Sequence, residues 1–142
     1  MSPTGAKALT EEEVARLRAA FAAVPFAALL GLEFVGASRG EAAFALDLRE
    51  GLTRMGGILH GGALASLLDT AAAFAVHTLL PPGGHTVTVD LTIHYLRPVS
   101  SGRVEARARV LREGRRLVIL SVEASGENGL PVATATTTYL KQ

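Results

Sequence analysis

Apolar and polar residues alternate along most of the second half of the chain, which is the pattern of half-buried β-strands. The run 86–95 is the clearest example, because apolar or aromatic residues occupy every second position from Val87 to Tyr95. The threonine, aspartate and histidine residues between them, Thr88 included, are therefore predicted to face the other way. The runs 103–112, 116–125 and 132–140 are predicted as three further strands, because glycine-containing turns separate them.

The first half of the chain combines two predicted strands with a long helix. In the segment 41–49, apolar residues at every second position from 42 to 48 are predicted to face one way and the charged residues 41, 47 and 49 the other, as in a strand buried on one face. Another strand-like run precedes it. From Gly61 to about Leu80 the chain is rich in alanine, leucine and phenylalanine and has no internal proline. This composition predicts a buried helix, which the Pro-Pro-Gly-Gly sequence of residues 81–84 ends.

The chain before these strands is predicted to contain a second helix. Residues 1–9 are interpreted as a disordered lead-in. Thr10 and Glu13 have the spacing of a capping box, in which each side chain bonds the backbone of the other residue, so a helix is expected over 10–24. Pro25 is expected to end it, and the apolar residues 26–31 are predicted to form a short turn.

Together these elements predict an α+β fold. One long helix between two early and four late strands favours an antiparallel sheet of five to six strands wrapped around that helix, with an extra N-terminal helix. A chain of 142 residues is long enough for one domain and too short for two, so residues 25–142 are predicted to form a single unit.

Composition excludes several classes of function. Without cysteine there is no thiolate catalysis and no sulfur-ligated metal, and the histidines lack the spacing of metal ligands. A net charge of +1 with few aromatic residues gives no reason to bind nucleic acid. No run approaches the ~20 apolar residues of a membrane span, and no leader is apparent, so we expect a cytoplasmic protein with no membrane partner.

One charged residue stands out in the long helix. Between Met55 and Val89 the only side chain that is fully ionised at neutral pH is Asp69. Its neighbours one helical turn away are alanine and serine, which offer no cation and solvate a carboxylate poorly, and poor solvation makes a carboxylate a stronger base. The other interpretation is that Asp69 faces water, or pairs with an arginine from a strand.

The loop before this helix supplies a second candidate group. Glycines flank His60 and continue into the helix, so Gly61 and Gly62 are expected to present unpaired N–H groups at the positive end of the helix dipole. Eight residues, or ~12 Å of helix axis, separate Gly61 from Asp69. One carbonyl cannot reach both groups in one subunit, so an antiparallel dimer is expected to combine them for attack on an acyl carbonyl.

These residues also carry a resemblance to a known family. The block Gly57-Ile58-Leu59-His60-Gly61-Gly62, the later Asp69, and the stretch from Thr88-Val89-Asp90 to Pro98 resemble the hotdog-fold thioesterases of the PaaI-like (phenylacetate-pathway, 4-hydroxybenzoyl-CoA thioesterase) superfamily. The similarity covers about residues 25–140. It implies a hotdog fold and hydrolysis of an acyl-CoA or aryl-CoA thioester to free acid and CoA. It also implies a homodimer that is expected to pair into a homotetramer, and no cofactor besides the CoA of the substrate.

The resemblance also implies roles for individual residues. Gly61 would donate its N–H to the thioester oxygen, and Asp69 of the neighbouring subunit would act as general base or as nucleophile. Thr88 would help to position water. His60 and Gly62 would belong to the part of the site that binds substrate, where His60 would chiefly shape the loop.

Arginines are the candidate contacts for the CoA phosphates. Arg54 stands where relatives commonly carry Asn or Gln, so it either donates hydrogen bonds near the carbonyl or reaches toward a phosphate. Arg97, Arg115 and Arg116 lie at predicted strand ends and in a hairpin, where guanidinium groups could bind phosphates, or serve only as solvated edge charges.

Three questions stay open at the level of sequence. An acyl-CoA-binding module with little turnover is an alternative, because Arg54 replaces an amide. A hotdog hydratase or dehydratase is a weaker one, because the histidine loop with adjacent prolines is absent. The helix 10–24 lies outside the family core, and either docks by an apolar face or caps the acyl pocket.

Overall fold

The long apolar segment forms the helix α3 (Gly61–His77), on which the rest of the chain is built. The computed structural model describes residues 5–142. Leu67, Leu68, Ala71 and Ala75 of α3 are completely buried, because the helix is apolar on nearly every side and lies against a sheet. The small alanines allow this close approach of helix and strands.

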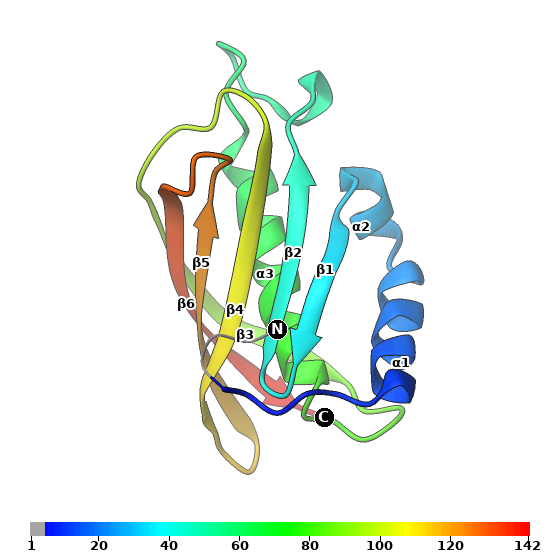
Figure 1. The fold of residues 1–142 in the computed structure, drawn as a ribbon. Coiled ribbons are helices and arrows are strands. Elements are labelled where there is room, and N and C mark those ends of the chain that lie inside the picture. The colour runs from blue at the N-terminus through cyan, green and yellow to red at the C-terminus, as the bar shows by residue number, and fades with distance from the viewer. Residues whose placement is uncertain (1–4) are drawn as a thin grey trace.

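Six antiparallel strands form the sheet that curves around α3 (Figure 1). Their order across the sheet is β1-β2-β4-β5-β6-β3, so β1 and β3 are its two edges. The strands are β1 (Glu33–Ser38), β2 (Glu41–Asp47), β3 (Thr86–Tyr95), β4 (Arg103–Glu113), β5 (Leu117–Ser125) and β6 (Pro131–Lys141). The predicted α+β architecture is therefore confirmed, with strand bounds within a few residues of the predicted ones.

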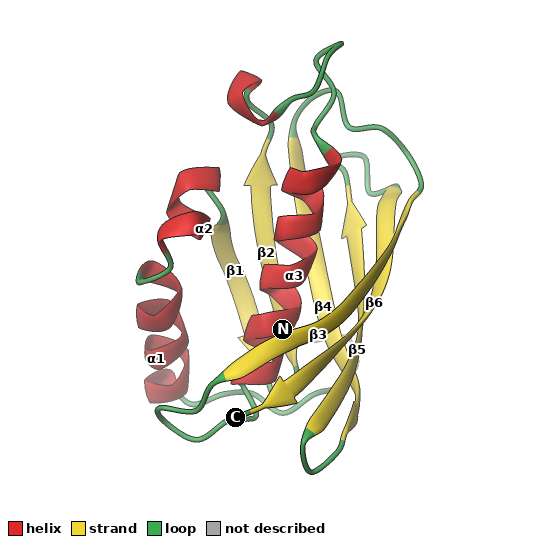
Figure 2. Cartoon of the chain, turned by 180° about the vertical axis from the view of Figure 1, so that it is seen from behind, coloured by secondary structure: helices red, strands yellow, loops and turns green. Residues whose placement is uncertain are grey.

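Two short helices lie beside α3 on the same side of the sheet (Figure 2). The first, α1 (Glu11–Ala22), begins at the predicted capping box of Thr10 and Glu13. The second, α2 (Pro25–Leu30), replaces the turn predicted at 26–31, and that prediction is wrong. Pro25 is the first residue of α2 because its fixed φ suits a helix start, and Gly31 ends it in the left-handed conformation at φ 73°.

β3 departs from the strict alternation that the sequence predicts. The pairing with β6 shifts between Thr88 and Asp90, so Val89 is the extra residue of a β-bulge. The Asp90 carboxylate stabilises the bulge by accepting a hydrogen bond from the Thr138 N–H at 3.1 Å. Because the bulge inserts one residue, Thr88 and Tyr95 face the same side of the sheet, toward α3, whereas the alternation predicted opposite sides.

β2 is buried on both faces, not on one as predicted. Ala43 and Ala45 are nearly inaccessible although they point away from α3. They pair with Arg107 and Glu105 of β4, which form an ion pair at 2.9 Å over this face. Long neighbouring side chains therefore cover the small alanines.

The predicted lead-in, residues 1–9, falls partly outside the described residues. The part from residue 5 onward has no regular secondary structure, and the Lys7 carbonyl accepts a hydrogen bond from the Arg39 N–H at 2.7 Å. None of the helices in residues 5–142 is long and apolar enough to cross a membrane.

Candidate active site

Asp69 lies in the middle of α3 with its half-buried side chain aimed at β3 and β6. Its Oδ1 atom accepts a hydrogen bond from the Thr88 hydroxyl at 3.0 Å and another from the Tyr139 hydroxyl. The Tyr139 oxygen also lies 2.7 Å from the Asp69 carbonyl oxygen. Of the two alternatives that the sequence left open, the arginine partner is not found among residues 5–142, where a tyrosine and a threonine hold the carboxylate.

Tyr139 is the residue of this group that sequence reasoning missed. It is only 1% exposed and lies opposite Thr88 in the pairing of β3 with β6. Burial, followed by the negative charge of Asp69, raises the pKa of Tyr139 well above its ordinary value. The phenol therefore stays protonated and remains a hydrogen-bond donor to Asp69. Only the strand register reveals it, because a tyrosine in an alternating strand looks like an ordinary core residue.

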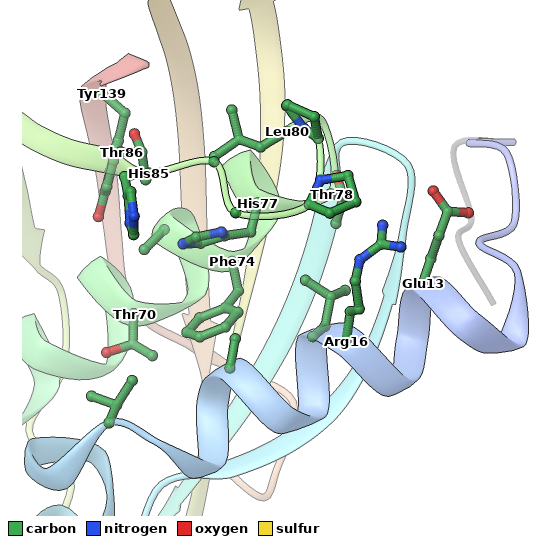
Figure 3. A pocket seen from close by; sticks show the side chains of 18 of the residues that line it. Glu13, Arg16, Thr70, Phe74, His77, Thr78, Leu80, His85, Thr86 and Tyr139 are labelled. Atoms are coloured by element: carbon green, nitrogen blue, oxygen red, sulfur yellow. The ribbon is translucent and has the colours of Figure 1, made fainter. Parts of the chain in front are cut away.

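Asp69, Thr88 and Tyr139 open into a cavity of about 640 Å³ between α1 and α3 (Figure 3). The loop after α3 and the beginning of β3 complete its walls. His77 and His85 face each other in this wall, and burial, followed by the charge of His85, lowers the pKa of His77. Within residues 5–142 no group of three or more potential metal ligands comes together.

The second part of the predicted site lies at the start of α3. His60 is the N-cap of the helix, and its Nδ1 accepts a hydrogen bond from the Gly62 N–H at 2.8 Å. The prediction that Gly62 has an unpaired N–H is therefore wrong, because the imidazole occupies it. The Gly61 N–H has no such partner in the described chain, since the first N–H groups of a helix lack intrahelical acceptors.

A second cavity, of about 270 Å³, surrounds Gly61. The Tyr95 hydroxyl donates a hydrogen bond to the Gly61 carbonyl at 2.8 Å, and the tyrosine ring would lie 3.4 Å from a Cβ atom at this position. Arg54 and Arg97 line the same cavity and donate hydrogen bonds to the carbonyls of Met55 and Pro131. Two positively charged side chains thus lie near the free N–H of Gly61. Within one chain, Arg54 lines the cavity of Gly61 and not the cavity of Asp69.

The predicted arginines do not gather at one place within a chain. Arg115 and Arg116 are exposed residues in the turn between β4 and β5. The strand pairing places this turn near the beginning of β3, whereas Arg97 follows the end of β3. Figure 1 shows this turn at the bottom of the sheet and the beginning of α3 near the top.

Comparison with known proteins identifies relatives over most of the chain. Residues 56–133 match the family model of the thioesterase superfamily. The medium/long-chain acyl-CoA thioesterase YigI of Salmonella typhimurium is 34% identical over 135 residues, which span 82% of this chain and 85% of YigI.

Solved structures agree with this result. A mutant of the phenylacetic acid degradation protein PaaI from Thermus thermophilus is 36% identical, with a TM-score of 0.76 and coverage of 82% of this chain and 98% of that one. PaaI of Escherichia coli is 24% identical, with a TM-score of 0.87 over 95% of this chain and 96% of that one. The latter likeness shows the fold, and the predicted hotdog fold is confirmed.

Proposed function

This chain belongs to the thioesterase superfamily and is a thioester hydrolase, and we propose that it hydrolyses acyl-CoA or aryl-CoA esters in a site shared by two copies. The observation that carries the proposal is that the protein has two candidate groups for this reaction. The Asp69 carboxylate is held by Tyr139 and Thr88, and the Gly61 N–H, at the start of the helix, has no acceptor in the described chain. YigI, which is named for acyl-CoA substrates, supports the choice of ester. No cofactor takes part beyond the CoA of the substrate.

Each of the two groups meets a different need of thioester hydrolysis. The Gly61 N–H donates to the thioester carbonyl oxygen, which gains negative charge as the carbon is attacked. Asp69 then acts in one of two ways: it takes a proton from the attacking water, or it attacks the carbon itself and forms an anhydride that water cleaves. In both ways the C–S bond breaks, CoA leaves as a thiolate that takes up a proton, and the net reaction consumes one water: the acyl carbon gains an oxygen from it directly or, in the anhydride route, from the carboxylate that water then restores.

The side chains around these groups position them. Tyr139 and Thr88 both bond Oδ1 of Asp69 and so fix the direction of the carboxylate, while its other oxygen, Oδ2, stays available for water or substrate. His60 occupies the Gly62 N–H, which leaves the Gly61 N–H as the donor at the helix start. The helix dipole adds to the positive potential there.

The geometry of α3 and β3 supports the proposal of a second copy. Gly61 and Asp69 line different cavities of one chain, about two helical turns apart. β3 is an edge strand, and its apolar residues Val89 and Tyr95 are 55% and 53% exposed. An exposed apolar edge of this length is a surface that another strand covers.

Antiparallel pairing of two β3 strands would join the two half-sites. Thr88, near the beginning of β3, bonds Asp69, and Tyr95, at its end, bonds Gly61. A twofold axis through the middle of β3 places the Thr88 end of one strand beside the Tyr95 end of the other. Asp69 of each chain then faces Gly61 of its partner, and the dimer has two equivalent sites. Pairing of such dimers into a tetramer follows the family and is part of the proposal.

The cavity of Gly61 is the proposed entrance for CoA. Arg54 and Arg97 line it and provide guanidinium groups for phosphates. In the dimer, the turn that carries Arg115 and Arg116 would come to the same side as the partner's Gly61 cavity, because it lies at the beginning of β3. We therefore propose that all four arginines, Arg54, Arg97, Arg115 and Arg116, contact CoA.

Mixing two inactive variants tests the shared site. Asp69→Asn should lower thiol release from acyl-CoA by about 10³-fold, and Gly61→Pro, which lacks the N–H, by about 10²-fold. After subunit exchange at equal concentrations, half of the dimers contain one chain of each kind, and one of their two sites carries neither change. About a quarter of the wild-type activity should return. Asp47→Asn, an exposed aspartate on β2, is the matched control and should keep full activity.

Two outcomes would contradict the proposal. If mixed samples stay inactive although mass spectrometry shows mixed dimers, the site lies within one chain. If Asp69→Asn hydrolyses acyl-CoA at the wild-type rate, the carboxylate has no part in the reaction.

A further inference from the structure

Asp69 lines one end of the cavity between α1 and α3, but the reaction described above gives the rest of this cavity no role. We infer that it is the acyl-binding pocket, and that α1 is the wall that limits the length of the acyl chain to about eight to ten carbons. This inference rests on the proposed function, because it places the thioester carbonyl beside Asp69.

The first wall is a stripe of residues on α3 that begins at the carboxylate. Asp69, Thr70, Ala73, Phe74 and His77 all line the cavity, and they are spaced so that they follow one face of the helix for two turns. An acyl group whose carbonyl carbon lies beside Asp69 would therefore run along α3 toward His77. Beyond Thr70, this face is made of a methyl group and an aromatic ring, which suit a hydrocarbon.

The second wall is formed by Leu17 and Ala20 of α1 and by Val24, which follows α1 as the N-cap of α2. The helix is fixed at this position by aromatic contacts, because the ring of Phe21 lies 4.9 Å from that of Phe44 and 5.8 Å from that of Phe74 between ring centres. The apolar residues of α1 thus face the apolar residues of α3 across the cavity. A chain between them would lose contact with water on both sides.

An ionic clamp closes the far end of the two helices. The Arg39 guanidinium bonds the Glu13 carboxylate of α1 at 2.8 Å and the Thr78 carbonyl, just after α3, also at 2.8 Å. Glu13 and Arg16 line this end of the cavity and lie apart from Thr70 and Phe74 (Figure 3). A hydrocarbon end that reached this far would meet charged groups, which is unfavourable.

The distance from Asp69 to His77 sets the expected chain length. Eight residues of helix span ~12 Å, and an extended chain advances ~1.2 Å per bond, so about ten bonds fit. The imidazole at this point is compatible with a hydrocarbon, because burial keeps the pKa of His77 low and its ring lies 5.2 Å from that of Phe74. The chemical class of substrate is therefore a medium-length acyl-CoA.

Filling the pocket from α1 tests the inference. Ala20→Phe places a ring in the cavity from an exposed position, so the fold should tolerate it. We expect kcat/KM for decanoyl-CoA to fall by tenfold or more, while kcat/KM for butanoyl-CoA stays within twofold of wild type. Ala19→Phe is the matched control, because Ala19 is exposed on the same helix and does not line the cavity, and it should leave both values unchanged.

The outcomes separate this inference from the proposed function. Equal losses for short and long esters in Ala20→Phe, or the same profile as Ala19→Phe, would overturn the pocket assignment while hydrolysis itself stands. Wild-type protein that releases no thiol from any CoA ester would overturn the proposed function. In that case calorimetry still decides the pocket: Ala20→Phe must weaken binding of decanoyl-CoA by tenfold or more and leave butanoyl-CoA unaffected, and equal affinities would overturn it.

Discussion

The two ends of the α3 stretch from Gly61 to Asp69 are built in opposite ways. At Asp69 the protein provides two hydroxyl donors, one of which belongs to the buried Tyr139, and a cavity with a second helix as its wall. At Gly61 it fixes the carbonyl through Tyr95 but leaves the N–H without an acceptor in the described chain. In the proposed mechanism the carboxylate must be aimed before the reaction, whereas the oxyanion donor must be left free for the substrate. One helix would meet both needs, because its interior is packed and its start is open.

After Asp69→Asn, the largest effect on this contrast is expected from removing the free amide while keeping the helix. Gly61→Pro should lower kcat for acyl-CoA by about 10²-fold, because proline has no N–H to donate to the oxyanion. Proline is well accepted at the first position of a helix, and the preceding His60 has φ −63° and ψ 135°, which a following proline permits. Thiol-release kinetics and thermal unfolding measure the two effects separately.

Gly61→Ala is the control for the amide, since it keeps the N–H and adds only a methyl group 3.4 Å from the Tyr95 ring. It should retain most of the activity. If Gly61→Ala is as impaired as Gly61→Pro, space at Gly61, and not its N–H, is what the reaction needs.

A smaller effect is expected at the other end, from loosening the carboxylate. Tyr139→Phe removes one of the two donors to Oδ1 of Asp69 and leaves the ring in place. We expect kcat to fall by about tenfold with KM little changed, because the carboxylate is less well aimed while the pocket is intact. Stability should fall by about 1 kcal/mol, as for loss of one hydrogen bond.

Thr137→Val provides the comparison for Tyr139→Phe. Thr137 is also buried in β6, and its hydroxyl bonds the Asp90 carbonyl, away from Asp69. It should lose stability without the tenfold loss of kcat. A Tyr139→Phe protein with wild-type kcat would show that Thr88 alone positions the carboxylate.

The smallest effect concerns the clamp that holds α1 over the cavity of Asp69. Arg39, followed by the Thr10 backbone, lowers the pKa of Glu13 from 4.5 to about 2 in the folded protein. A lowered folded pKa stabilises the protein above the unfolded value, and this stability is lost as the pH falls through the folded one. The difference in melting temperature between wild type and Glu13→Gln should thus be full at pH 6, and should shrink between pH 4.5 and pH 2.

Glutamine at position 13 still accepts a hydrogen bond from the Thr10 N–H, so the substitution removes the charge and keeps the cap. Glu12→Gln, in the same helical turn and exposed, is the control and should show no such dependence on pH. A difference between wild type and Glu13→Gln that stays constant down to pH 2 would contradict the ion pair as its source.

The sequence was most informative where a pattern is local. The capping box of Thr10 and Glu13, the run of alanine and leucine in α3, and the late strands all depend on neighbouring residues, and their predicted bounds agree with the structure to within a few residues. Both helices end earlier than predicted, α1 at Ala22 and α3 at His77. It was misleading where a local signal has two interpretations. Pro25 both ends one helix and begins the next, and only packing of α2 on the core selects the second.

The isolated Asp69 and the glycines after His60 were visible in the sequence because an unpaired charge in an apolar helix and a glycine-rich helix start are unusual in themselves. Tertiary structure decided what surrounds them. The bulge at Val89 turns Thr88 toward Asp69, and the register of β6 brings Tyr139 from 70 residues away to the same oxygen. Strand register and bulges depend on hydrogen bonds between distant segments, so no local pattern encodes them, and they determine where this carboxylate points.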